Sequence, residues 1–195
     1  MTWGRYMMHR RSLLIGGASL GLTPLAWGRS VSTVSIHFDG EVYELQHAVL
    51  PAKGDRLQEF IRPGESLQSW TRLIGLRLQH VPGADPVALA VALHRTVLQT
   101  NPQAQAVVAT NEARTEGVTD FLTWPADGSF LEFNIFRYAK PAGATGILSF
   151  QVAHRFYGQA SRGLGEHIRL LRQSWLRQVL ALDMPRLHLQ LVHAS

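Results

Sequence analysis

The chain has 195 residues, no cysteine, and 19 Lys and Arg against 14 Asp and Glu. This length is enough for one ordinary domain, and the lack of cysteine excludes disulfides and thiolate metal sites. Nucleic-acid binding is not indicated by the net charge of +5, because the arginines are scattered along the chain rather than clustered.

The first 28 residues have the three parts of a signal peptide. Arg10 and Arg11 stand before a short run of small and apolar residues, and Ala26 and Gly28 provide the small side chains at which a signal peptidase cuts. The adjacent arginines resemble a twin-arginine signal, and a general secretory signal is the alternative. An uncleaved membrane anchor is disfavoured because glycines interrupt the apolar run.

We therefore expect cleavage after Gly28 and a mature chain of residues 29–195 that forms a single domain in the periplasm. Its partners during export would be the export machinery and signal peptidase. No stable membrane span is expected in the mature chain, and a periplasmic protein partner is an open possibility.

The first half of the mature chain predicts a hairpin, a strand, a helix and another strand. Asp39 and Gly40 form the hairpin turn, since both residue types tolerate positive φ angles. Apolar residues at helical spacing predict the helix, and alternation predicts the last strand. The predicted ranges are strand 31–38, a second hairpin strand that starts at Tyr43, strand 56–61, helix 66–74 and strand 75–81.

The second half predicts a helix, a four-strand meander and a closing helix. Asp85 is a typical N-cap and Pro86 suits the first helical turn, so the first helix begins there and ends near Asn101. Turn-rich segments separate the strands predicted at 105–110, 118–124, 131–138 and 147–157, and an amphipathic helix is predicted at 164–180. The fold class is α+β, with an antiparallel sheet covered by helices.

Residues 59–70 resemble a segment of small exported bacterial proteins of unassigned activity. The order of elements resembles the PsbP-like group, which includes the periplasmic protein DcrB. This resemblance implies a PsbP-like layer architecture and an accessory or binding role, and it transfers no catalytic residues.

Four side chains are candidates for acid–base chemistry. His94 lies on the apolar side of its predicted helix, and His154 continues the inward face of its strand, so the two rings could lie near each other between sheet and helix. Glu132 and Asp120 are the carboxylates that could pair with either ring. The alternatives are satisfied core histidines and a solvated sheet face.

No metal site and no bound cofactor are predicted. His188 and His193 are five residues apart, which on a strand sends the two rings to opposite faces. The sequence therefore favours an exported accessory or binding protein without its own catalytic activity. A small hydrolase-like enzyme with a His and carboxylate pair, and a carrier of metal or cofactor, are the alternatives.

Overall fold

The computed structural model describes residues 34–49, 55–158 and 163–193, and residues 33–195 form one compact unit. The expected export residues Arg10, Arg11, Ala26 and Gly28 lie outside the described residues, as does the expected cleavage point.

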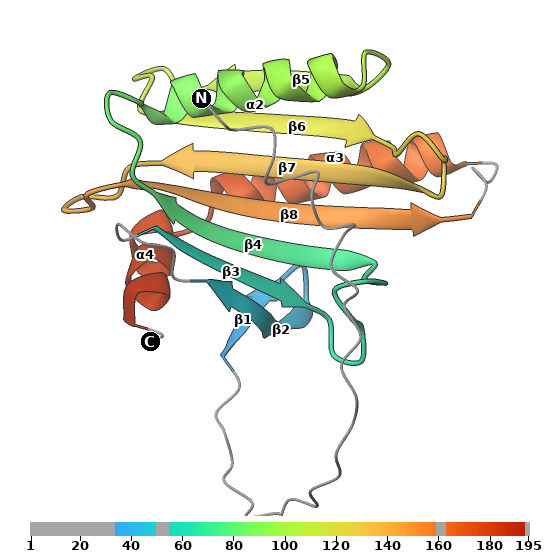
Figure 1. Ribbon diagram of the computed structural model, residues 1–195, viewed down its shortest axis with the longest axis horizontal. Coiled ribbons are helices and arrows are strands. Elements are labelled where there is room, and N and C mark those ends of the chain that lie inside the picture. Colours follow the sequence, from blue (N-terminus) through green and yellow to red (C-terminus); the bar gives the residue numbers. More distant parts are fainter. Residues whose placement is uncertain (1–33, 50–54, 159–162, 194–195) are drawn as a thin grey trace, which may run out of the picture. The chain divides into compact units, whose positions relative to one another are not determined.

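Eight strands and three helices make up the described chain (Figure 1). In order they are β1 (Ser35–Phe38), β2 (Glu41–Val49), β3 (Arg56–Ile61), β4 (Arg72–Gln79), α2 (Pro86–Thr100), β5 (Gln105–Thr110), β6 (Glu116–Thr123), β7 (Phe130–Ala139), β8 (Ile147–Tyr157), α3 (Leu164–Leu180) and α4 (Met184–His193).

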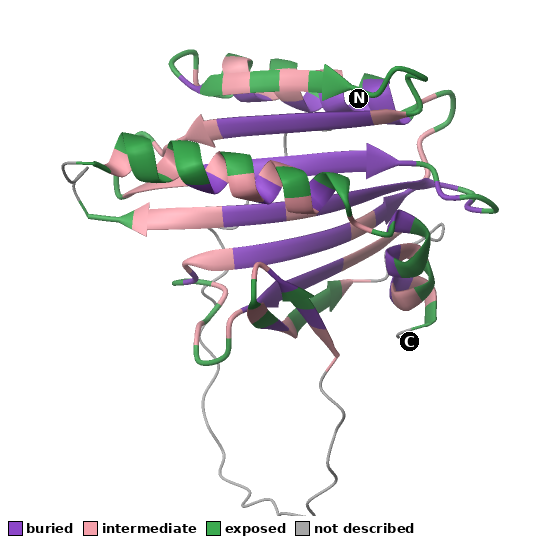
Figure 2. Cartoon of the chain, turned by 180° about the vertical axis from the view of Figure 1, so that it is seen from behind, coloured by how far each residue is buried: buried purple, intermediate pink, exposed green. Residues whose placement is uncertain are grey.

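The strands form one antiparallel sheet in the order β1-β2-β3-β4-β8-β7-β6-β5. Two meanders, β1 to β4 and β5 to β8, are joined where β4 pairs with β8. Helix α2 covers one face of the sheet at the second meander. Helices α3 and α4 lie on the other face, where α3 packs on β7 and α4 packs on β3 and β4 (Figures 1 and 2). The α+β class and the antiparallel sheet covered by helices are therefore confirmed.

Helix α2 packs unusually close to β6. Its start follows the predicted signals: Asp85 caps the helix by accepting a 2.6 Å hydrogen bond from the Ala88 backbone N–H, and Pro86 occupies the first turn. Gly117 of β6 faces the helix, where a Cβ atom would lie 2.7 Å from the Cβ of Ala90. Because Gly117 has no side chain, α2 can pack closely against β6.

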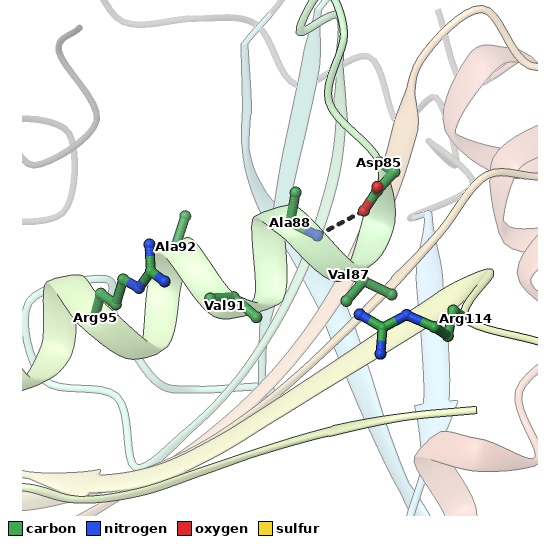
Figure 3. Close-up of a pocket in the computed structure, with 7 residues that line it drawn as sticks. All are labelled: Asp85, Val87, Ala88, Val91, Ala92, Arg95 and Arg114. Atoms are coloured by element: carbon green, nitrogen blue, oxygen red, sulfur yellow. Dashed lines mark hydrogen bonds between the residues drawn. The ribbon is translucent and has the colours of Figure 1, made fainter. Parts of the chain in front are cut away.

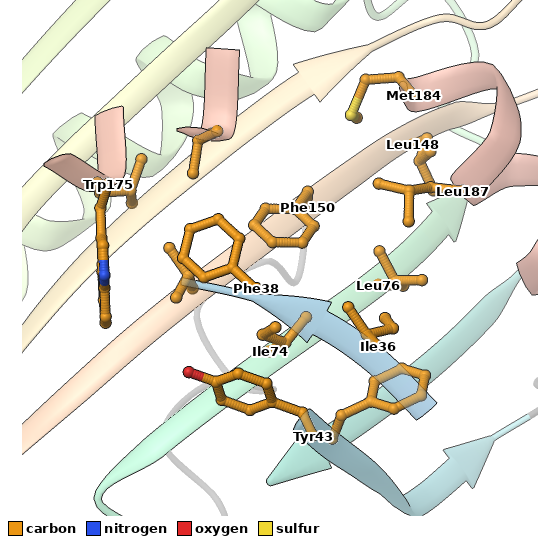
Figure 4. Close-up of a cluster of buried hydrophobic side chains, with 14 of the residues drawn as sticks. Ile36, Phe38, Tyr43, Ile74, Leu76, Leu148, Phe150, Trp175, Met184 and Leu187 are labelled. Atoms are coloured by element: carbon orange, nitrogen blue, oxygen red, sulfur yellow. The ribbon is translucent and has the colours of Figure 1, made fainter. Parts of the chain in front are cut away.

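On the opposite face, α3 packs an aromatic core against the sheet (Figure 4). Trp175 is fully buried, and its ring meets those of Phe38 and Phe133 with centroids 5.8 and 6.1 Å apart. Phe38 also contacts Phe150 of β8. The hairpin β1–β2 and helix α3 are thus held together by the same buried side chains.

The predicted helix at 66–74 is wrong. Residues 72–79 are strand β4, and Trp70 instead lies in the turn-rich segment before it, buried against Ile61, Leu73 and Ala153. The helical spacing of apolar residues was misleading because β4 is a central strand, buried on both faces, and such strands lack alternation. The expected strand at 75–81 is the second half of β4.

The chain end also differs from the expectation. No element was predicted after residue 180, whereas residues 184–193 form helix α4, whose buried side chains Met184, Leu187 and Leu191 pack into the α3 core. None of the described helices combines the length and apolarity that a membrane crossing requires.

Candidate functional site

The sheet separates the four acid–base candidates into two pairs. His154 is opposite Phe133 in the β7–β8 register, and Asp120 is opposite Ile135 in the β6–β7 register, so both side chains share the face covered by α3. His94 belongs to α2 and therefore lies over the other face, to which Glu132 also points. The structure does not bring His94 and His154 together. His94 lies on α2, over one face of the sheet, whereas His154 points to the opposite face, which α3 covers.

His154 sits in an apolar stack. Its ring lies 4.0 Å from the Phe156 ring and 6.1 Å from the Trp175 ring, measured between centroids. Within the described part of the chain, its Nδ1 atom is buried and has no hydrogen-bond partner. Burial, followed by the positive charge of Arg72, lowers the pKa of His154 to about 4. The ring is therefore neutral at neutral pH.

A charged cluster borders His154, made of Asp39, Glu41, Arg62, Glu65 and Arg72. Arg72 lies 3.4 Å from the Asp39 carboxylate and 3.2 Å from that of Glu41. Arg62 lies 2.9 Å from Glu65 and 3.5 Å from Glu41. These contacts join the β1–β2 hairpin to the segment between β3 and β4.

The charged cluster also determines how nearby groups ionise. Burial raises the pKa of the Tyr43 hydroxyl to about 12, although the nearby positive charge of Arg72 acts in the opposite direction. Burial alone would raise the pKa of Glu65, but hydrogen bonds from Thr71 and Arg62 outweigh it and the pKa is lowered. Glu65 is consequently held as the ion-pair partner of Arg62.

Asp39 connects the charged cluster to α3. Its carboxylate accepts hydrogen bonds of 2.8 Å from Trp175 Nε1 and 2.8 Å from Gln178 Nε2. Its φ of 53° is a left-handed conformation that aspartate tolerates better than most residues, as the predicted hairpin turn requires. Asp39 therefore has a structural role that its place in a turn did not reveal.

The two candidate carboxylates are engaged in other contacts. Arg172 of α3 donates two hydrogen bonds to Asp120, of 2.7 and 2.9 Å. Glu132 accepts a 2.7 Å hydrogen bond from Arg155, whose guanidinium lies 3.9 Å from the Trp70 ring centroid and 4.3 Å from that of Phe130. Each carboxylate thus ties parts of the fold together, and neither pairs with a histidine in the contacts the structure describes.

An open groove with a volume of about 430 Å³ lies along α2 beside the β5–β6 turn (Figure 3). Its floor is built from small and apolar side chains of the helix, and arginines from two different elements flank this floor. Its lining residues are Asp85, Val87, Ala88, Val91, Ala92, Arg95 and Arg114.

Charge in this groove is unbalanced. Asp85 is occupied as the α2 N-cap. The side chains of Arg95 and Arg114 form no hydrogen bond or ion pair within residues 34–49, 55–158 and 163–193. Arg114 adopts a left-handed φ of 54° in the β5–β6 turn. Free guanidinium groups above an apolar floor are suited to binding an acidic ligand.

Sequence reasoning did not single out Arg95 or Arg114. Arg95 stands on the exposed side of a predicted helix and Arg114 in a predicted turn, which is the common setting of a solvated arginine. Their juxtaposition arises only when the β5–β6 hairpin folds beside α2. No sequence spacing could have revealed it.

Among the described residues there is no group of three His, Cys, Asp or Glu side chains that could hold a metal ion. His188 and His193 lie on α4, where a separation of five residues turns the two side chains about 140° apart around the helix axis. The segment is a helix and not the strand on which the spacing was considered, but the two rings still do not share a face.

A protein-family model matches residues 32–184, which include every strand and helix from β1 to α3. The family is of bacterial type and has no assigned activity, and the match does not extend to the PsbP-like group. No curated protein and no solved structure matches the chain.

Proposed function

The chain belongs to this bacterial-type family, and from its site we propose that it is an exported accessory protein that binds a periplasmic partner and catalyses no reaction of its own. The observation that carries the proposal is the α2 groove, where two arginines without a described partner flank an apolar floor. The acid–base candidates, in contrast, are separated by the sheet or held in ion pairs.

Export is part of this proposal, and it rests on the arginine pair and the small residues before residue 29. We expect the mature protein in the periplasmic fraction to begin at Arg29. Replacing both Arg10 and Arg11 with lysine should keep the precursor in the cytoplasm if the twin-arginine route is used. Mass spectrometry of the fractionated protein measures both outcomes, and an intact Met1 on periplasmic protein would contradict the proposed cleavage.

For the fold, we propose that the α+β arrangement is a PsbP-like layer architecture. Its support is an antiparallel sheet with a helix on one face and two helices on the other.

Binding through the groove can be tested in living cells. A photo-crosslinking amino acid placed at Ala92, on the groove floor, should give a discrete adduct with a periplasmic protein. The same amino acid at Arg177, an exposed residue of α3 on the opposite face, is the matched control and should give none. Equal adducts from both positions would contradict a specific binding surface in the groove.

The enzyme alternative has one observation in its favour, which is the neutral His154 ring with its buried Nδ1 atom. If a hydrolase activity of the purified protein were abolished by His154→Gln while the Ala92 crosslink persisted, the proposal of a non-catalytic protein would be wrong. Activity that is unchanged by His154→Gln would belong to a contaminant or to another site.

A further inference from the structure

Strand β5 is an open edge of the sheet. It stands at the end of the strand order and, among the described strands, pairs only with β6 (Figure 1). The Asn111 backbone N–H donates to the Glu116 carbonyl at 3.4 Å, in the same register as the β5–β6 pairs. Because backbone groups alternate in direction along an antiparallel strand, Ala106, Val108 and Thr110 direct theirs away from β6.

The sequence of β5 has none of the usual protection against pairing with another chain. Edge strands in soluble proteins commonly carry charged residues, prolines or bulges. Residues 105–110 read Gln-Ala-Val-Val-Ala-Thr, and Val107 is 49 % exposed. The other edge strand, β1, has only four residues. An uncharged six-residue edge is therefore available for one more strand.

The α2 groove runs beside this edge. Helix α2 packs across β5, β6 and β7, and Ala106 and Val108 of β5 are partly buried against it. In a strand added to β5, every second side chain would point to the α2 side of the sheet. Those side chains would meet the groove floor formed by Val91 and Ala92.

Spacing and charge identify what these side chains would be. Val87 lies beside Arg114 in the groove, and the helix rises about 12 Å from Val87 to Arg95. Two side chains four residues apart on one face of an extended strand are about 13 Å apart. Two acidic residues with this spacing could therefore meet both arginines.

We propose that β5 and the α2 groove together bind an extended acidic segment of a partner protein, which adds to the sheet as a further strand. This inference rests on the proposed function and specifies the partner's chemistry. Backbone hydrogen bonds to β5 would give affinity, and the alternate side chains in the groove would give specificity.

Charge argues against two other occupants. Symmetric pairing of β5 with a second copy would gather two Arg95 and two Arg114 side chains around one axis, with only the capping Asp85 of each copy as an acid among the groove residues. Residues 1–28 of the chain itself contain three arginines and no acid, so they do not complement the groove.

The test uses a synthetic peptide as the probe, acetyl-Thr-Glu-Thr-Val-Thr-Glu-Thr-amide, with the purified full protein. Binding is followed by NMR, and amide hydrogen exchange is measured at β5. We expect slowed exchange at Ala106, Val108 and Thr110 when the peptide is present. A matched peptide with lysine at both glutamate positions should bind at least tenfold more weakly.

A charge exchange tests the groove without disturbing the core. Arg95→Glu should weaken binding of the glutamate peptide at least tenfold and strengthen binding of the lysine peptide. Arg177→Glu on α3 is the control and should change neither affinity. Thr110→Pro should weaken the glutamate peptide several-fold, since it removes an exposed outward N–H that the β5–β6 ladder does not use.

Three results would overturn the inference. Binding without slowed exchange at β5 would exclude strand addition, and binding that is indifferent to Arg95→Glu would exclude the acidic ligand. Slowed exchange in a dimeric protein without peptide would show that a second copy occupies the edge. A groove crosslink at Ala92 that persists in any of these cases would leave the accessory function intact, so the two proposals fail separately.

Discussion

The ring of His154 illustrates how a single residue can make stability depend on pH. Its neutral form is favoured in the folded protein, where burial and Arg72 lower its pKa to about 4. In the unfolded chain the pKa returns to about 6.5. Between these values the unfolded chain binds more protons, so the free energy of unfolding falls as the pH is lowered.

We therefore predict that His154→Leu reduces the loss of stability between pH 7 and pH 4.5. The wild-type protein should lose about 1–2 kcal/mol through this residue, a figure reduced from the full pKa shift because the ring is partly accessible to solvent. Urea unfolding of both proteins at the two pH values measures the difference. Parallel pH dependence of wild type and variant would show that other groups, such as Glu65, cause the loss.

At the scale of elements, Arg137 fastens the end of α3 to the sheet. Its Nη1 atom is hydrogen-bonded to the carbonyl oxygens of Val179, Leu180 and Leu182 at 2.9, 3.1 and 3.0 Å. The same guanidinium pairs with Glu116 at 2.8 Å and is 8 % exposed as a residue. It thus supplies a charged donor to carbonyl groups at and just beyond the C-terminus of α3, where intrahelical donors run out.

Arg137→Met should lower the free energy of unfolding by about 2–4 kcal/mol, because it leaves buried carbonyls and Glu116 without their donor. Chemical denaturation measures this loss. The control is Arg169→Met, which removes an exposed arginine paired with Glu166 on the same helix and should leave the unfolding midpoint unchanged. Similar midpoints for the two variants would show that the contacts of Arg137 contribute little.

Replacing glycine with alanine should change the free energy of unfolding in opposite directions at two positions, Gly117 and Gly165. At Gly117 a Cβ atom would lie 2.7 Å from Ala90 Cβ and 2.9 Å from the Pro86 carbonyl oxygen, so Gly117→Ala should push α2 outward and cost about 1–3 kcal/mol. At Gly165, inside α3, nothing lies within 4 Å, so Gly165→Ala should stabilise by about 0.5–1 kcal/mol. Thermal unfolding of the two variants measures both effects. A Gly117→Ala protein as stable as the wild type would contradict the close packing of α2.

Local sequence signals identified some elements and missed others for physical reasons. The bounds of α3 at 164–180 and the β5 and β8 ranges agree with the predictions. One side of α3 and of β5 is more exposed than the other, and β8 alternates large apolar side chains with smaller or polar ones although most of it is buried. The first half of strand β4 was taken for a helix because both faces of this strand are buried. Helix α4 was missed because its short apolar face also fits a strand.

The candidate site was harder to predict than the fold. The sequence placed His94 on a helix and His154 on a strand, but which face of the sheet a helix covers depends on contacts between distant residues. Because α2 and α3 cover opposite faces, the two histidines are separated. The packing of α2 also brings Arg95 and Arg114 together, although they belong to a helix and to a hairpin turn.

For the whole molecule, the pairing of β4 with β8 makes one sheet from two meanders and predicts a single unfolding step. A protein that starts at Arg29 should unfold cooperatively, with tryptophan fluorescence and far-ultraviolet circular dichroism giving the same urea midpoint. Separate transitions for the two probes would show that the meanders are independent domains.

The place of β8 late in the chain has a consequence for synthesis in the cell. When β4 leaves the ribosome, its eventual neighbour is still 68 residues away, since β4 ends at Gln79 and β8 begins at Ile147. At 5–20 residues per second, this interval lasts about 3–14 s. During that time the apolar strand β4 has one unpaired edge. A nascent polypeptide of this kind would therefore depend on a chaperone to prevent aggregation until translation is complete.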